Sequence, residues 1–290
     1  MLKKKLKKTK KVKNYKKNKN NLKIISWNVN GLRSNSMSII DKNNQFNNQS
    51  NLFKLIKKED PDILCICETK CQKDHENIFS NLLPFQYKEW NSSIDRLGYS
   101  GVAIFSKIPL KKHKFIPGLE SDLQGRYLVL ETTNLLLIYA YVPNSGSNEK
   151  YRKEIWDPAI YNYLKKKKKE YENVIYFGDL NVVSDYNDIY NPQIIKKGKN
   201  AGVKDFERKT FKNFITKEPV GLGYCDALRK IYNDDKIWTW WDPRTKGREK
   251  DNGWRLDYFL VSNEKKIKDA KILNEYHGSD HCPIFLNISY

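Results

Sequence analysis

Near the C-terminus, Asp280 and His281 stand side by side in the sequence Gly-Ser-Asp-His-Cys-Pro at residues 278–283. His281 is one of only four histidines in the chain, and an apolar run of strand length follows it. A carboxylate can bind a metal ion or orient water, and an imidazole can move a proton. Hydrolysis of a phosphodiester needs both kinds of group. A Ser-Asp-His turn can also be ordinary loop hydrogen bonding, so the prediction depends on other polar clusters in the chain.

Two pairs of polar residues, each spaced two positions apart, follow other apolar runs. They are Asp179 with Asn181, and Asn28 with Asn30. Residues two apart point to the same side of an extended strand. An aspartate and an asparagine placed in this way could accept a proton from water and hold the attacked group. The pair at Asn28 is weaker evidence by itself, because the Asn-Gly step that follows is a common turn.

A further carboxylate, Glu68, comes directly after the apolar run 63–67. A buried carboxylate costs free energy unless it is paired or bound to a cation, and hard oxygen ligands suit Mg²⁺. The alternative is a salt bridge from Glu68 to Lys70 or Arg33.

Asp257 is a carboxylate in an otherwise apolar strand, and Tyr141 lies where another apolar run stops. The natural partner of Asp257 is an imidazole, and His281 is the candidate, since a carboxylate often orients a histidine. Pairing of Asp257 with Arg255 would instead make it structural. Tyr141 could donate its phenol proton to a phosphate or could pack as an ordinary aromatic. Because all these clusters lie where apolar runs end, we predict one metal-phosphate site at one edge of the fold.

Apolar runs of strand length recur along the chain, with helical patterns between some of them. The predicted strands cover residues 22–27, 63–67, 102–106, 127–131, 135–142, 174–177, 256–261 and 284–288. The predicted helices cover residues 52–56, 151–164 and 206–215. Since strands and helices do not alternate strictly, we expect an α+β protein in which two sheets pack face to face under helices. We predict a single domain over residues 21–290.

The chain has a formal charge of +20, and residues 1–20 contain eleven lysines and no acidic residue. This segment has few large apolar side chains, so we predict a disordered tail. It could be a solubilising tail, a product of biased composition, a nucleic-acid arm or a nuclear-localisation signal. The rest of the chain stays net positive, which suits a polyanionic partner.

The chain shows neither a membrane segment nor a disulfide framework. No apolar run approaches the ~18 residues of a spanning helix, so we expect no membrane partner. Five cysteines in 290 residues do not make a disulfide scaffold. Cys65 and Cys67 lie in an apolar run, where cysteine packs as a small hydrophobe, so we predict no zinc site. A reducing compartment follows.

Several longer motifs occur in a fixed order between about residues 22 and 288. They are Trp-Asn-x-Asn-Gly-Leu-Arg (27–33), Glu-Thr-Lys (68–70), Gly-Tyr-Ser-Gly-Val (98–102), Ala-Tyr-Val-Pro-Asn (140–144), Gly-Asp-Leu-Asn-Val (178–182), Gly-Trp-Arg-Leu-Asp-Tyr-Phe (253–259) and the hexapeptide at 278–283. With these motifs the chain resembles the exonuclease III-like apurinic/apyrimidinic (AP) endonucleases of the endonuclease/exonuclease/phosphatase superfamily.

This resemblance implies a four-layer αββα sandwich of two packed mixed β-sheets flanked by helices. It also implies a DNA-repair enzyme that uses Mg²⁺, with Mn²⁺ as a substitute, to cut 5′ to abasic sites in double-stranded DNA and leave a 3′-hydroxyl. Activities as a 3′-phosphodiesterase and a 3′→5′ exonuclease are further expectations. The enzyme would be a monomer that acts on DNA inside the cell, in the nucleus of a eukaryote or the cytoplasm of a bacterium or virus-infected cell.

The resemblance also implies roles for individual residues. Glu68, Asn30 and Asp280 would lie at the metal. Asp179 would activate the attacking water, and Asp257 would hold His281. The residues that contact the scissile phosphate would be Asn28, Tyr141, Asn181 and His281. The other residues that line the substrate or DNA site would be Arg33, Asn144, Asn200, Trp238, Trp240, Trp241 and Leu256.

The chain departs from the family pattern at a few positions. Asn30 stands where some relatives have Asp, and Cys67 replaces the usual Gln before Glu68. None of these changes removes a group assigned to catalysis, so they bear on substrate preference more than on activity. Two alternatives stay open: action on another phosphoester, such as RNA ends, a phosphoinositide or sphingomyelin, and a non-enzymatic nucleic-acid-binding protein.

Overall fold

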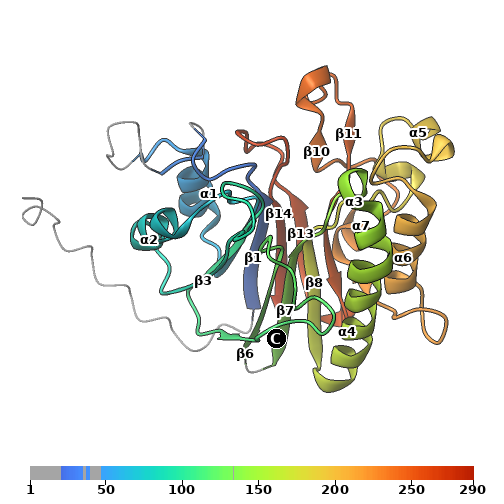
Figure 1. Cartoon of the computed structure of the whole chain (residues 1–290), viewed down its shortest axis with the longest axis horizontal. Helices are drawn as coiled ribbons and strands as arrows, with labels where there is room; N and C mark the ends of the chain where they lie inside the picture. Colours follow the sequence, from blue (N-terminus) through green and yellow to red (C-terminus); the bar gives the residue numbers. More distant parts are fainter. Residues whose placement is uncertain (1–20, 35–36, 40–46, 133) are drawn as a thin grey trace, which may run out of the picture.

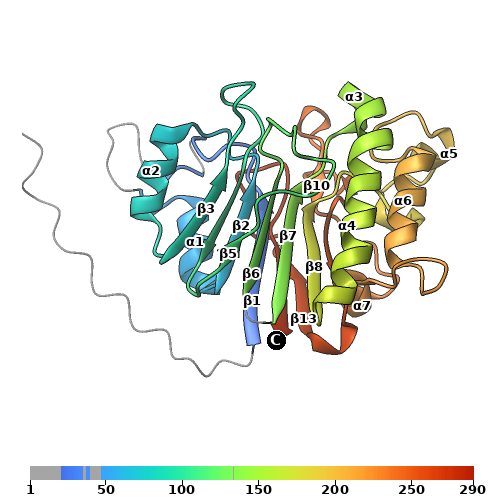
Figure 2. The same cartoon turned by 60° about the horizontal axis from the view of Figure 1, so that its bottom comes forward.

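The computed structural model describes residues 21–34, 37–39, 47–132 and 134–290. These residues form two six-stranded sheets packed face to face, with helices against both outer faces (Figures 1 and 2). The predicted α+β sandwich of four layers is confirmed. The Lys-rich segment 1–20 lies outside the described residues, so the disordered tail stays a prediction.

The first sheet has the strand order β13-β14-β1-β2-β4-β3. Its strands are β1 (Asn21–Asn28), β2 (Ile63–Cys67), β3 (Tyr87–Asn91), β4 (Val102–Ser106), β13 (Ile267–Ile272) and β14 (Ile284–Ser289). β1 runs parallel to β2 and antiparallel to β14. The loop that precedes β14 therefore lies where β1 and β2 end.

The second sheet has the order β5-β6-β7-β8-β12-β9. Its strands are β5 (Lys111–Lys112), β6 (Tyr127–Thr132), β7 (Leu135–Tyr141), β8 (Asn173–Asp179), β9 (Cys225–Asp226) and β12 (Asp257–Val261). β7 and β8 are parallel, and β12 runs antiparallel to β8. A separate pair, β10 (Trp240–Trp241) and β11 (Gly253–Trp254), projects beyond the sandwich in Figure 1.

Helices cover both outer faces. The α-helices are α1 (Asn51–Glu59), α2 (Lys73–Leu82), α3 (Ser145–Tyr151), α4 (Asp157–Glu170), α5 (Gln193–Lys197), α6 (Asp205–Ile215) and α7 (Ala227–Tyr232). A π-helical turn, η1 (Arg152–Trp156), joins α3 to α4, and three short 3₁₀ turns are η2 (Tyr186–Asp188), η3 (Pro243–Thr245) and η4 (Glu264–Lys266). In the described part of the chain, no helix is long and apolar enough to cross a membrane.

Alternation along the strands builds three apolar layers. In β2, Ile63, Cys65 and Cys67 face the opposite sheet, whereas Leu64 and Ile66 face the helix layer that contains α1 and α2. This is the pattern of a strand buried on both faces. The helices α4 and α6 pack in the same way on the second sheet. Cys65 and Cys67 are therefore core residues, as predicted from their apolar run.

All eight predicted strands and all three predicted helices correspond to observed elements. Four of the strands that were missed, β5, β9, β10 and β11, are only two residues long, and the two longer ones, β3 and β13, are more polar. β3 is half-buried along its whole length, and in β13 only Ile267 and Ala270 are buried. Neither strand has the apolar run that identified the others.

Candidate active site

The ends of five strands meet at one edge of the sandwich. Asn28 is the last residue of β1, and Glu68 follows the parallel strand β2. Tyr141 and Asp179 end the parallel strands β7 and β8 and lie opposite each other. Asp257 begins β12 and pairs with Asp179 on the other side. The strand register therefore gathers residues that are far apart in the sequence.

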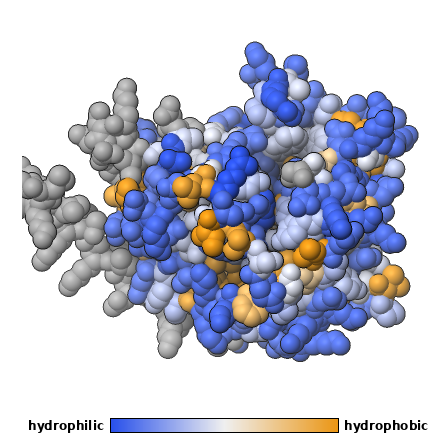
Figure 3. All heavy atoms as spheres, viewed as in Figure 1, coloured by the Kyte–Doolittle hydropathy of each residue, from blue (hydrophilic) through white to orange (hydrophobic). Residues whose placement is uncertain are grey.

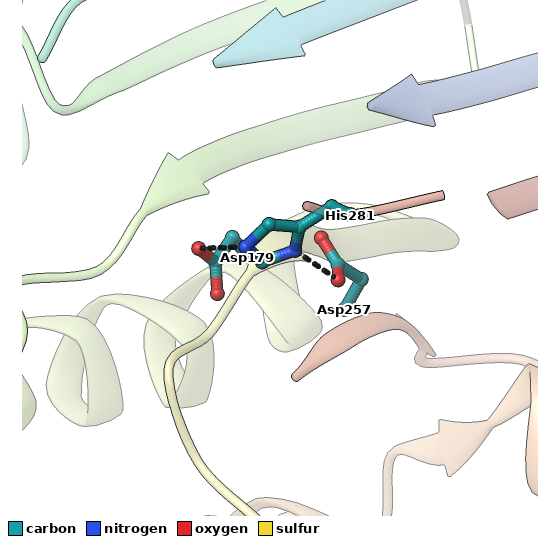
Figure 4. Close-up of side chains that lie close together, drawn as sticks. All are labelled: Asp179, Asp257 and His281. Carbon is teal, nitrogen blue, oxygen red and sulfur yellow. Dashed lines mark hydrogen bonds and ion pairs between the residues drawn. The ribbon is translucent and has the colours of Figure 1, made fainter. Parts of the chain in front are cut away.

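His281 lies between two carboxylates, Asp257 and Asp179 (Figure 4). Its Nδ1 is 2.8 Å from Asp257 Oδ2, and its Nε2 is 3.8 Å from Asp179 Oδ2. Burial alone would lower the pKa of His281, but Asp257 and Asp179 raise this pKa to about 10. Burial raises the pKa of Asp179 to about 7, against the opposing effect of His281. The site thus holds a charged imidazole beside a carboxyl group that can exchange a proton near neutral pH.

Arg255 does not compete for Asp257. Its guanidinium lies 2.7 Å from Asp188 Oδ1 and 2.6 Å from Asp226 Oδ2, in a buried ion-pair network. The alternative in which Asp257 pairs with Arg255 is therefore wrong. The backbone of Asp257 is held instead by Thr239, whose Oγ1 accepts a hydrogen bond from the Asp257 N–H.

Asn28 joins the two sheets at the floor of the site. Its Nδ2 donates to Glu68 Oε1 over 2.9 Å and to Asp179 Oδ2 over 3.0 Å, and lies 3.4 Å from His281 Nε2. The side chain of Asn28 is completely buried. It therefore fixes the positions of both carboxylates more than it offers a free group to a substrate.

Asn181 is also tied to Asp179. Its backbone N–H donates to Asp179 Oδ1 over 3.0 Å, and its Nδ2 donates to Val142 O over 2.9 Å. Asn144 Nδ2 lies 3.4 Å from Asn181 Oδ1. Asn181, which is predicted to contact the phosphate, and Asn144, which is predicted to line the substrate site, are therefore neighbours.

Tyr141 lies against a buried guanidinium. Arg126 Cζ is 4.8 Å from the Tyr141 ring centroid, and Arg126 is itself buried. Burial, followed by the charges of Glu68 and Asp179, raises the pKa of Tyr141 well above its ordinary value. The phenol thus keeps its proton and can act as a hydrogen-bond donor.

Two of the three predicted metal ligands, Glu68 and Asn30, contact the ammonium of Lys70. Lys70 Nζ lies 3.0 Å from Glu68 Oε2 and donates to Asn30 Oδ1. Asn30 Nδ2 donates to Asp280 Oδ1 over 3.1 Å, and Asp280 Oδ2 accepts from Trp240 Nε1 over 3.0 Å. The salt bridge to Lys70 that was the alternative for Glu68 is thus present.

These oxygens fit a hard divalent cation. Oxygens of Glu68 and Asn30 already meet one positive charge, that of Lys70, and carboxylate and amide oxygens are the donors that Mg²⁺ prefers. A second group, Asp179, Asp257 and His281, also has ligand atoms within 4.8 Å of one another. Because His281 is charged and bonded to Asp257, that group suits a cation less well.

A cavity of about 490 Å³ opens beside these groups. Among the predicted residues, those that line it are Glu68, Tyr141, Asn144, Asp179, Asn181, Asn200, Trp240, Leu256, Asp280 and His281. The cavity is also lined by Arg244 and by residues to which the sequence analysis gave no role, which are Tyr190, Ile194, Ala201, Gly202, Asp242, Thr245, Asn252 and Trp254. Trp254 stands within a quoted motif and meets Trp240 edge to face, with ring centroids 5.4 Å apart.

Three predicted substrate residues lie elsewhere. Trp238 and Trp241 are buried in a small apolar cluster with Cys282. Both rings fill space beside Gly253, where an added Cβ would lie 2.4 Å from Trp238. Arg33 is exposed near the site, with Nη2 3.5 Å from the carbonyl oxygen of Lys70. The structure therefore places Trp238 and Trp241 in the core instead of at the cavity.

Arg152, which no sequence motif indicated, supports the loops that carry the two asparagines. Its guanidinium donates to Pro143 O over 2.8 Å, to Leu180 O over 3.1 Å and to Asn181 O over 3.4 Å. Asp157 Oδ1 accepts from its Nε over 2.9 Å. Arg152 is buried in the π turn η1, and it holds together the ends of β7 and β8.

Comparisons with known proteins agree with this geometry. Residues 25–281 match the Endonuclease/Exonuclease/phosphatase family. An "Exodeoxyribonuclease" of Bacillus subtilis is 37% identical over 276 residues, which cover 92% of this chain and 100% of that protein. The "DNA repair nuclease APEX1" of Danio rerio is 37% identical over 274 residues, covering 92% of this chain and 82% of that protein.

A crystal structure of an AP endonuclease from Leishmania major superposes with a TM-score of 0.76 at 26% identity, covering 93% of this chain and 88% of that one. The strand order, the gathered polar residues and the matches over most of the chain lead to one assignment. The chain belongs to the Endonuclease/Exonuclease/phosphatase family and is a hydrolytic nuclease related to the exodeoxyribonucleases and AP endonucleases.

Proposed function

We propose that this nuclease cuts double-stranded DNA on the 5′ side of abasic sites, with Mg²⁺ as the cofactor and Mn²⁺ as a substitute. The observation that carries the proposal is the buried group of Asp179, His281 and Asp257 at the floor of the cavity, joined by Asn28 to Glu68. Similarity to the DNA repair nuclease APEX1 of Danio rerio supports DNA repair as the setting.

Hydrolysis breaks the bond between phosphorus and O3′ while water adds to phosphorus. Asp179 accepts one proton of the water, and the leaving O3′ takes up a proton from solvent and is released as the 3′-hydroxyl. His281, Tyr141 and Asn181 hold the phosphate oxygens, and Asp257 keeps His281 charged and oriented. A divalent cation held by Glu68 and Asp280, with Asn30 beside them, would neutralise charge on the phosphate.

The cavity wall suits a nucleotide without its base. Trp240, Trp254 and Leu256 supply apolar surface in the same cavity as the polar groups. A sugar turned out of the duplex could lie against these side chains, while its 5′ phosphate meets the residues of the floor. Asn144 and Asn200 line the same cavity as polar neighbours.

The test is incision of a labelled duplex that carries one abasic site, with Mg²⁺ or with EDTA, beside an undamaged duplex. We expect cutting 5′ to the lesion in Mg²⁺ alone, with the undamaged strand intact. Binding without cutting would contradict the proposal and direct attention to RNA or lipid phosphoesters.

A second activity is favoured by the similarity to the Bacillus subtilis exodeoxyribonuclease along that protein's whole length. We propose that the same site removes nucleotides or blocking groups from 3′ ends. Since a single chain supplies every group named above, we also propose that the enzyme acts as a monomer, which sedimentation with and without DNA would test.

A further inference from the structure

Two large apolar side chains are displayed on the loop of residues 92–99, between β3 and β4. Ile94 is 74% exposed and Leu97 is 72% exposed. Leu123, on a neighbouring loop, is 48% exposed. On the face drawn in Figure 3 the surface is mainly hydrophilic, with a few separate apolar areas. Displaying several large apolar side chains close together costs hydration free energy, so a cluster of this kind often marks an interaction site.

The 92–99 loop has its own internal hydrogen bonds. Ser93 Oγ donates to Asp95 Oδ1 over 2.7 Å, and the Arg96 N–H donates back to Ser93 Oγ over 3.3 Å. The Ile94 N–H donates to Leu123 O over 2.8 Å. Arg96 Cζ stacks 4.7 Å from the centroid of the Tyr99 ring. The loop therefore holds Ile94 and Leu97 outward in a defined conformation.

This loop borders the proposed active site. A second cavity, of about 420 Å³, is lined by residues of the 92–99 loop together with Leu123, Arg126 and Pro143. Arg126 Nη2 donates to Tyr99 Oη over 3.0 Å, and its guanidinium also lies on Tyr141, which lines the first cavity. One arginine thus connects the wall of the active site with the loop that carries Ile94 and Leu97.

We infer that the 92–99 loop is a second DNA-contacting surface, on which Ile94 and Leu97 press against base edges beside the incised phosphodiester. This inference rests on the proposed function. Apolar side chains inserted at a base step are a recurring way to unstack and bend duplex DNA. A base step next to an abasic site has already lost stacking, so an apolar contact there is less costly than in intact DNA.

The surroundings favour DNA over a protein partner. Arg126 links the loop to Tyr141 in the wall of the proposed phosphodiester site. Arg96 belongs to the loop, and Arg33 lies beside it, with Nη2 3.8 Å from the Cβ position of Gly98. The carboxylates that face the second cavity are engaged within the protein. Asp95 accepts from Ser93 and Gln124, and Asp122 accepts from backbone N–H groups.

The inference is tested with the double variant Ile94→Ser, Leu97→Ser. Binding to a duplex with a tetrahydrofuran abasic analogue is measured by fluorescence anisotropy in EDTA. We expect affinity to fall about tenfold or more, because two apolar side chains lose their burial. Hydrolysis of the small diester bis(4-nitrophenyl) phosphate should be unchanged, because that substrate does not reach the loop.

Two control variants sharpen the result. Val220→Ser removes a 78% exposed apolar side chain from the loop after α6 and should leave affinity unchanged. The double variant Ile94→Met, Leu97→Met should keep most of the affinity, since it keeps apolar surface. Parent-like binding by the serine variant would overturn the inference while parent incision of abasic DNA still stands. If the parent does not incise abasic DNA at all, the proposed function itself is wrong.

Discussion

At the scale of single residues, the site depends on charges that burial would otherwise remove. Buried His281 stays charged because Asp257 and Asp179 outweigh its desolvation. Asp179 shows the opposite balance, since burial raises its pKa into the range where it can exchange a proton with water. The two carboxylates thus keep His281 charged so that it can hold a phosphate, whereas burial prepares Asp179 to accept a proton.

Replacing Asp257 by Asn should remove the largest influence that keeps His281 charged. We expect kcat to fall on the order of a hundredfold or more. Because the pKa of His281 falls, the alkaline loss of activity should begin at a lower pH than in the parent. A pH–rate profile of both proteins measures this, and an unshifted alkaline limb would contradict the role of Asp257. Adding His281→Ala to the Asp257→Asn variant should lower kcat only a little further, because the two residues act as a unit.

Lys70 meets the same oxygens that we assign to the cation. The variant Lys70→Met should therefore bind Mn²⁺ more tightly, by several-fold, because a competing positive charge is gone. Calorimetric titration in the absence of DNA measures the change. Lys73→Met, which removes the exposed partner of Glu76, is the matched control and should bind Mn²⁺ as the parent does.

At the scale of elements, the strand ends explain why distant residues converge. Gly178 shows how closely the strands must approach: a Cβ there would lie 2.1 Å from Ala140 O, and its φ is +127°. Only glycine therefore fits directly before Asp179. Asn30, Glu68, Lys70 and Asn181 also have positive φ, and such conformations persist where the surrounding structure holds them.

Glu131, at the end of β6, ties its sheet to α4. Lys111, then Tyr171 and His113, lower the pKa of Glu131 to about 2. A lowered folded-state pKa adds stability that is present above the ordinary pKa of 4.5 and is lost as pH falls towards about 2. Glu131→Gln should therefore unfold at lower urea concentration than the parent at pH 6. The difference between the two urea midpoints should shrink as the pH falls from 4.5 towards 2. The exposed control Glu249→Gln should change the urea midpoint at pH 6 by less than Glu131→Gln does.

At the scale of the whole molecule, the layers and most of the site could be predicted because apolar runs mark buried strands and polar residues stand at their ends. Trp238 and Trp241 could not be separated from Trp240 in this way, since composition does not show which ring faces a cavity. Arg126 and Arg152 were missed for a related reason. Their importance lies in carbonyl and ring contacts that only the folded chain creates.

The net charge of the chain belongs to this scale as well. Deleting residues 1–20 removes eleven lysines, so binding to duplex DNA should weaken and its dependence on salt should flatten. Incision at low salt should survive. Anisotropy titrations at several salt concentrations give the slope of log affinity against log salt concentration. Equal slopes for the full chain and the deletion variant would exclude a role of residues 1–20 as a nucleic-acid arm.

The π turn at Arg152–Trp156 has a consequence for tolerance of insertions and deletions. Such a turn contains one residue more than an α-helical turn, and each residue of a helix rotates the chain by about 100°. Deleting the half-exposed Ile155 should leave a regular helix, yet it would turn Arg152 away from Pro143 and Leu180 if α4 keeps its packing. We expect the deletion variant to keep its helical circular dichroism and to lose most of its incision rate, whereas Ile155→Ala, which preserves the length of the turn, should lose little.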